Sequence, residues 1–137
     1  MPLPLFIASL AAWRAAYTDA PGAYALSEAS NTVVKLSIKA VADARTAATL
    51  GAEREGTGIV IDSKRGLILT IGYLILEAAS ILVMTRDGRI YPASVAGFDH
   101  ASGFGVVRTL SGLSSAAVDL GDSGALREIT TVSIAGH

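Results

Sequence analysis

The chain has 137 residues, with 11 Lys and Arg, 12 Asp and Glu, and a formal net charge of −1. No basic block stands out, so the charge pattern argues against nucleic acid as a partner. Cys is absent, which excludes disulfides and thiol chemistry. The two histidines, His100 and His137, lie too far apart in sequence to indicate a metal site, and we expect no cofactor.

Residues 1–30 form the first predicted region, in which an apolar run, Leu3–Trp13, precedes a linker. One interpretation is an apolar helix over about residues 4–17, ended by Pro21-Gly22. The other is a secretory signal peptide cleaved near residue 25. No Lys or Arg precedes the run and Arg14 follows it, which favours the helix.

The two interpretations of the N-terminus lead to different cellular locations. The location is periplasmic or secreted if residues 1–25 are a signal peptide, and cytoplasmic otherwise. In either case the run is too short to cross a bilayer, so we expect no transmembrane span. A helix that is apolar on nearly all sides needs a protein surface to cover it.

Short apolar segments separated by turn residues follow from residue 31 onward. Residues 31–41 alternate between apolar and polar side chains, which is typical of a half-buried strand. The small and polar segment Ala42–Arg54 predicts a loop or a loose hairpin. The predicted strands cover about residues 32–40, 56–62, 66–70, 80–86, 89–97, 103–109 and 129–134.

Asp87-Gly88 is the strongest turn signal in the chain. It separates the apolar-rich segments ILVMTR and RIYPASV. An Asp-Gly pair between two such segments predicts a tight β-hairpin in which both central residues adopt positive φ.

Several segments together match a known pattern. Residues 56–62 read GTGIVID, residues 97–106 read GFDHASGFGV, and residues 120–127 read LGDSGALR. Combined with the Asp87-Gly88 hairpin, they resemble the first β-barrel of HtrA/Deg-type trypsin-like serine proteases, over roughly residues 31–137. The resemblance implies an all-β fold, a six-stranded Greek-key barrel that is one half of the double barrel, preceded by the N-terminal helix.

The positions that should carry the family's catalytic His and Asp are substituted. Tyr73 stands where the resemblance places the general-base His, and Gly103 stands where it places the catalytic Asp. A phenol has an ordinary pKa of about 10 and is a poor base near neutral pH. Glycine has no side chain to orient a base. We therefore predict no catalytic residue in this chain, and we interpret His100 as a turn residue rather than a relocated base.

Gly121-Asp122-Ser123-Gly124 looks like the nucleophile motif of digestive trypsin-like enzymes. Ala125-Leu126 follows it instead of Gly-Pro, and in the resembling family the nucleophile lies well downstream. Gly, Asp and Ser are also common turn residues, so we interpret the segment as a surface turn. The family's Gly-Asn-Ser-Gly-Gly-Pro motif does not occur in these 137 residues.

Two functions remain open at this point. The first is a catalytically inactive trypsin-like domain, a pseudoprotease that acts as a binding or structural module. The second is a segment of a larger HtrA-like serine endopeptidase whose nucleophile half is absent from this chain. Both predict a protein or peptide partner: a C-terminal barrel, or a second copy contacting the apolar Ile71–Ile75 turn and Phe104.

Overall fold

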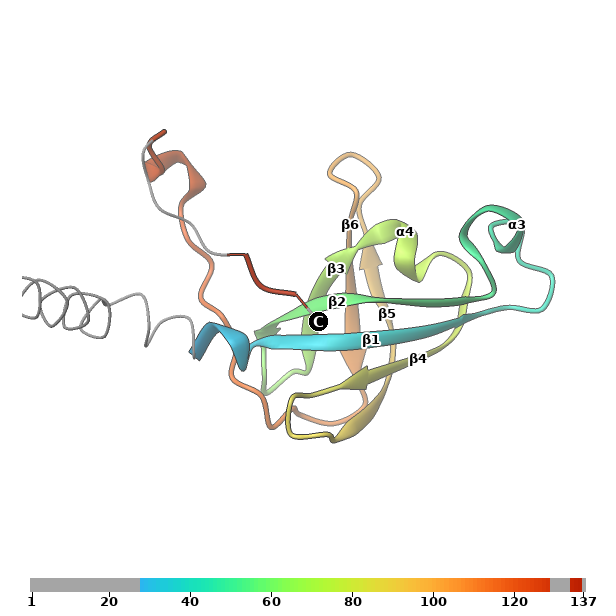
Figure 1. The fold of residues 1–137 in the computed structure, drawn as a ribbon, viewed down its shortest axis with the longest axis horizontal. Helices are drawn as coiled ribbons and strands as arrows, with labels where there is room; N and C mark the ends of the chain where they lie inside the picture. Colours follow the sequence, from blue (N-terminus) through green and yellow to red (C-terminus); the bar gives the residue numbers. More distant parts are fainter. Residues whose placement is uncertain (1–27, 129–133, 137) are drawn as a thin grey trace, which may run out of the picture.

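A computed structural model describes residues 28–128 and 134–136 of the chain, and all structural statements below refer to these residues. Its centre is a closed barrel of six antiparallel strands in the order β1-β2-β3-β6-β5-β4 (Figure 1). The strands are β1 Val33–Ala40, β2 Glu53–Asp62, β3 Leu67–Ile71, β4 Ala78–Met84, β5 Ile90–Phe98 and β6 Phe104–Thr109. The predicted all-β, six-stranded fold is confirmed.

Alternation along the strands explains why the sequence closes into a barrel. Val34, Leu36 and Ile38 of β1 point inward and are almost completely buried, while the residues between them face outward. Ten apolar residues form the core cluster: Val34, Leu36, Ile38, Val60, Ile68, Leu74, Ile75, Ile81, Val83 and Val107. Removing this apolar surface from water is the main force that holds the barrel together.

Besides the helical residues 28–30, three short helical segments lie outside the strands in the described part of the chain. They are α3 Ala47–Leu50 between β1 and β2, α4 Gly72–Ile75 between β3 and β4, and the 3-10 turn η1 Ser123–Ala125. Figure 1 shows α4 at the same end of the barrel as the loop between β5 and β6. None of the described helices is long and apolar enough to cross a membrane.

Two sequence predictions were wrong in detail. Glu53 and Arg54 belong to β2 and not to a loop, because the buried Arg54 alternates with exposed glutamates as in any barrel strand. The β4–β5 turn has positive φ only at Gly88 (82°), and not at Asp87. Thr85 O accepts from Gly88 N, and Arg89 O accepts from Thr85 N, so the loop is longer and needs one left-handed residue instead of two.

Some predictions fall where the structure gives no description. The predicted N-terminal helix lies within residues 1–27, and only residues 28–30, just before β1, are described as helical. The predicted strand 129–134 also lies almost wholly outside the described residues, and Ile134 itself is not in a strand. The division of the chain at residue 30 therefore stays a prediction.

Candidate functional site

The positions that resemble a catalytic His and Asp come together at one end of the barrel. β3 and β6 are neighbours, and their last paired residues are Ile71 and Phe104. Immediately beyond this pair, Gly72 N donates a hydrogen bond of 2.7 Å to Gly103 O. The fold thus places the start of α4, which carries Tyr73, directly against the loop that carries Gly103.

Neither position presents a group suited to general-base catalysis. Tyr73 is 54% exposed, and none of the hydrogen bonds found among the described residues involves its hydroxyl. Gly103 has φ of 76°, and a Cβ added there would meet nothing within 4 Å. The backbone segments of the two positions are in contact. Their side chains provide only the phenol of Tyr73, because Gly103 has no side chain.

The side chains of α4 correct the expectation of an apolar turn facing a partner. Gly72, Leu74 and Ile75 are buried, and only Tyr73 of this helix is exposed. Leu74 packs against Gly56 and Ile75 against Gly105, and a Cβ at either glycine would collide with these side chains. The small residues of β2 and β6 therefore let α4 close this end of the barrel.

Asp99, the acidic residue closest to Gly103 in sequence, is engaged by its own loop. Its carboxylate accepts hydrogen bonds from Ala101 N at 3.1 Å and from Ser102 N at 3.2 Å. The Ser102 hydroxyl first, and then these two amides, hold the pKa of the Asp99 carboxyl below its ordinary value. This carboxylate caps the loop, and among the described residues no hydrogen bond joins it to a histidine.

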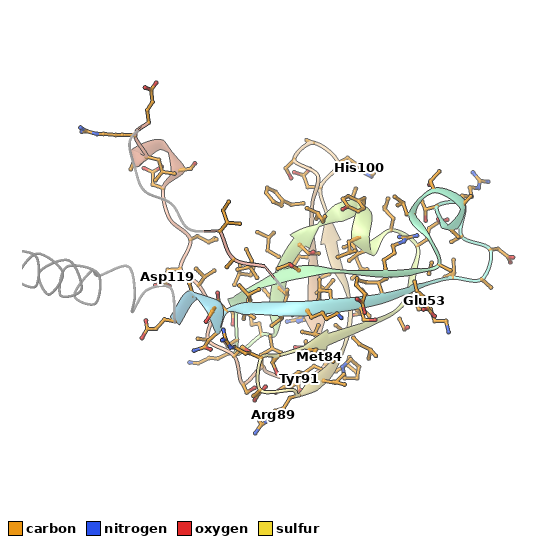
Figure 2. All side chains as sticks on the ribbon, in the orientation of Figure 1. Glu53, Met84, Arg89, Tyr91, His100 and Asp119 are labelled. Carbon is orange, nitrogen blue, oxygen red and sulfur yellow. The ribbon has the colours of Figure 1, made fainter. Side chains whose placement is uncertain are left out.

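His100 lies in the loop between β5 and β6, as Figure 2 shows. Its ring packs edge-on against Phe98, with the ring centroids 4.4 Å apart. The Phe98 ring in turn covers Gly72, where a Cβ would collide with it. No hydrogen bond links His100 to a serine or a carboxylate in the described part of the chain, so its contacts are those of a packed turn residue.

The sequence analysis missed a buried arginine that holds α4 in place. Arg54 is 5% exposed, and its guanidinium donates to the carbonyl oxygens of Tyr73 (3.3 Å) and Leu76 (2.7 Å) at the end of α4. It also donates to Thr46 Oγ1 at 2.7 Å. The sequence would have revealed Arg54 only if the strand had been predicted to begin at residue 53, which puts Arg54 at an inward position. The prediction of a loop over residues 42–54 hid this.

Glu77 completes this network from the exposed side. Its carboxylate accepts from Thr46 N at 2.9 Å and from Thr46 Oγ1 at 2.7 Å. The amide of Thr46 is the main reason that the pKa of Glu77 lies below its ordinary value. Thr46 thus joins the two charged side chains, and the loop before β2 is fastened to the segment that carries Tyr73.

Ser123 lies apart from this site. It begins η1, an exposed turn that stands off from the barrel in Figure 1. Asp122 Oδ1 accepts from Gly124 N at 2.9 Å, so the aspartate of this motif caps its own turn. The segment is a surface turn, as the sequence predicted.

A second serine, Ser114, has polar neighbours at the opposite end of the barrel from His100. Ser114 Oγ accepts from Tyr91 Oη at 3.0 Å and donates to Asp87 Oδ2 at 3.3 Å. Figure 2 shows Tyr91 at the end of the barrel that is distant from His100. These contacts tie the segment after β6 to the β4–β5 hairpin. In the described part of the chain no three His, Cys, Asp or Glu side chains gather closely enough to hold a metal ion.

Comparison with known families and curated proteins gives a consistent result. The family described as trypsin-like peptidase domain matches residues 56–137. The periplasmic serine endoprotease DegP of Salmonella typhimurium is 33% identical over 72 residues, which cover 53% of this chain and 15% of that protein. DegP of Escherichia coli strain K12 is 31% identical over 72 residues, with the same coverage.

Solved structures show the same barrel. A structure described as the HtrA-type protease AlgW with tripeptide has a TM-score of 0.63 and 25% identity, and the match covers 77% of this chain and 31% of that chain. The serine endoprotease from Yersinia pestis, with a TM-score of 0.55, 24% identity and coverage of 71% and 32%, supports the fold alone. The chain spans about 15% of the length of the curated relatives that it matches.

Proposed function

Because the chain belongs to the trypsin-like peptidase domain family and has an HtrA-type barrel, we propose that it is a pseudoprotease that serves as a binding or structural module. One observation carries the proposal. The hydrogen bond from Gly72 N to Gly103 O joins the segments that carry the two positions which the resemblance assigns to His and Asp, and these positions hold Tyr73 and Gly103.

The chemistry of peptide hydrolysis explains why these two residues matter. A serine nucleophile needs a base whose pKa lies near the working pH, and the base needs a carboxylate to hold its tautomer. In the worked serine-protease template, loss of the carboxylate alone lowers turnover by about 10⁴. A glycine at position 103 removes this carboxylate, and Tyr73 replaces the base itself.

The proposed partner is a protein or a peptide, and the shape of the barrel suggests where it binds. All six strands are paired in a closed ring, which disfavours binding by addition of a strand to a free edge. The exposed apolar side chains at the site end are Ile71, Tyr73 and Phe104, which are 42%, 54% and 50% exposed. A surface of this kind suits a C-terminal barrel or another protein subunit.

The second candidate is a segment of a larger HtrA-like serine endopeptidase, with its catalytic groups supplied by another part of the protein. The observation that favours it is coverage, since the chain matches only 15% of DegP from Salmonella typhimurium and 31% of the AlgW chain. Reading the gene beyond codon 137 separates the candidates. A continuing frame that encodes Gly-x-Ser-Gly-Gly-Pro would favour the endopeptidase segment.

The direct test is activity and labelling of the purified chain. We expect no peptidase or esterase turnover and no covalent labelling by a serine-directed phosphonate, while an active trypsin-like protease treated in parallel is labelled. The matched control is the Ser123→Ala variant, which should behave like the unchanged chain. Labelling that maps to Ser123 and disappears in this variant would contradict the proposal.

A further inference from the structure

The outer face of the barrel carries a band of apolar side chains that crosses four neighbouring strands. Strand pairing aligns Val33 with Ile59, Ile59 with Leu69, and Leu69 with Val106. The pair Ile71 and Phe104 extends the band toward α4. We call these six residues the apolar belt: Val33, Ile59, Leu69, Ile71, Phe104 and Val106.

The belt is uncharged and open along most of its length. Ile59, Ile71 and Phe104 are 40%, 42% and 50% exposed. Cross-strand neighbours on one face of a sheet lie side by side, so these side chains form one continuous surface. Continuous exposed apolar surface is uncommon on monomeric proteins and marks a contact.

One end of the belt is already covered. Val33 is an outward residue of β1, yet it is only 8% exposed. It lines a hollow together with Arg86, with Ser30 just before β1, and with Ala135 and Gly136. Residues near both ends of the described chain therefore lie beside the first residue of the belt.

In the sequence, the apolar run Leu3–Trp13 precedes the described residue Ser30 that lines this hollow. It contains no charged residue, and residues 14–27 connect it to the first described residue. A connection of this length can span roughly 45 Å when fully extended. Four adjacent strands are roughly 15 Å wide, so the run can reach every residue of the belt in its own chain.

We propose that Leu3–Trp13 docks on the apolar belt of the same chain. The apolar run and the exposed part of the belt are then buried against one another, and the connection keeps them at high local concentration. This inference is independent of the lack of catalysis. The two proposals share Ile71 and Phe104, so a partner that contacts these residues must first displace the run.

Trp13 is the only tryptophan of the chain, so its fluorescence reports on the run directly. We expect the full chain to show blue-shifted emission and protection from a soluble quencher, both unchanged on dilution from micromolar to nanomolar concentration. Ile71→Lys should shift the emission to the red and raise the quenching constant severalfold. Phe104→Lys should have the same effect and serves as the second belt variant.

Leu82→Lys is the matched control. Leu82 is 43% exposed, also faces outward from a strand, and belongs to β4, away from the belt. This variant should leave the fluorescence of Trp13 unchanged, and circular dichroism should show that all three variants retain the barrel.

Four outcomes would overturn the proposal. They are a solvent-exposed Trp13 in the unchanged chain, equal effects of the belt variants and Leu82→Lys, protection that disappears on dilution, and removal of the run during export. The third outcome would assign the belt to a second copy of the chain. The fourth would identify residues 1–25 as a signal peptide, with mass spectrometry of the exported chain as the readout. None of the four bears on phosphonate labelling, so this proposal and the pseudoprotease proposal can fail separately.

Discussion

The turn between β4 and β5 and the loop between β5 and β6 are built with the same two devices. Each has an aspartate that accepts hydrogen bonds and a glycine with positive φ: Asp87 with Gly88 at 82°, and Asp99 with Gly103 at 76°. They differ in what the aspartate holds. Asp87 binds the buried Thr85 hydroxyl, Arg89, and Ser114 from a distant segment, whereas Asp99 binds amides of its own loop.

This difference shows why glycine is compatible with the fold at position 103, where the resemblance places a catalytic Asp. Asp99 and the left-handed Gly103 close the β5–β6 loop, and Gly103 contributes its carbonyl oxygen to α4. Nothing in the loop needs a side chain at position 103. The position is free for glycine, and a glycine relieves the strain that most residues suffer at positive φ.

The largest expected effect tests whether Gly88 and Gly103 contribute equally to stability through their positive φ. Gly88→Val and Gly103→Val should each destabilise the chain by about 1–3 kcal/mol, because a β-branched residue resists positive φ. Both sites open to solvent, so backbone strain is the only cost. Chemical denaturation measures the difference. The control is Gly97→Val in β5, where space is also open but φ is not positive, and where we expect little or no loss.

A smaller effect is expected for Asp, the residue that the resemblance places at position 103. Gly103→Asp should cost about 1 kcal/mol or less, because Asp tolerates the left-handed region better than Val does. Denaturation beside Gly103→Val measures it. Equal losses for the two variants would show that the cost does not depend on how well the side chain tolerates the left-handed region.

Removing one hydroxyl group from each loop tests how much its aspartate contributes to stability. Thr85→Val should lower stability by about 1 kcal/mol, since it removes the hydroxyl that donates to Asp87 from a side chain that is 2% exposed. Ser102→Ala in the exposed β5–β6 loop should lower it less. Thr85→Ser keeps the hydroxyl and is the control. If Ser102→Ala costs as much as Thr85→Val, anchoring does not distinguish the loops.

Acid should weaken both loops in the same direction. The Thr85 hydroxyl lowers the pKa of Asp87, and the Ser102 hydroxyl lowers that of Asp99, both below the ordinary value of 3.8. A lowered pKa in the folded state means stability that is present above the unfolded pKa and is lost as pH falls through the folded pKa. Denaturation across this acidic range should show a shallower decline for Asp87→Asn and Asp99→Asn than for the unchanged chain. A steeper decline in either variant would contradict the assignment.

The smallest expected effect is no change at all. Introducing both residues that the resemblance predicts, with Tyr73→His and Gly103→Asp together, should give no peptidase turnover in this chain, because Ser123 lies in a separate surface turn. A fluorogenic peptide assay checks this, with each single variant as a control. Turnover in the double variant alone would show that a nucleophile is present after all.

Local signals were sufficient for most of the barrel. Alternation in β1 and the Asp87-Gly88 turn act over a few residues, so both could be predicted from the sequence. The assignment of Tyr73 and Gly103 to the positions of the family's His and Asp rests on the motifs around them and stays a prediction. The sequence could not show that only Gly88 of the hairpin has positive φ, because loop length depends on how the two strands pair.

Only the tertiary structure decided what surrounds the candidate site. The burial of Leu74 and Ile75 depends on glycines of β2 and β6 that are distant in sequence. The role of Arg54 depends on the carbonyl oxygens of α4 being left without partners inside such a short helix. Short-range periodicity determines which residues form strands. Which polar groups meet across the barrel is set by the closed packing of all six strands, and no local pattern encodes it.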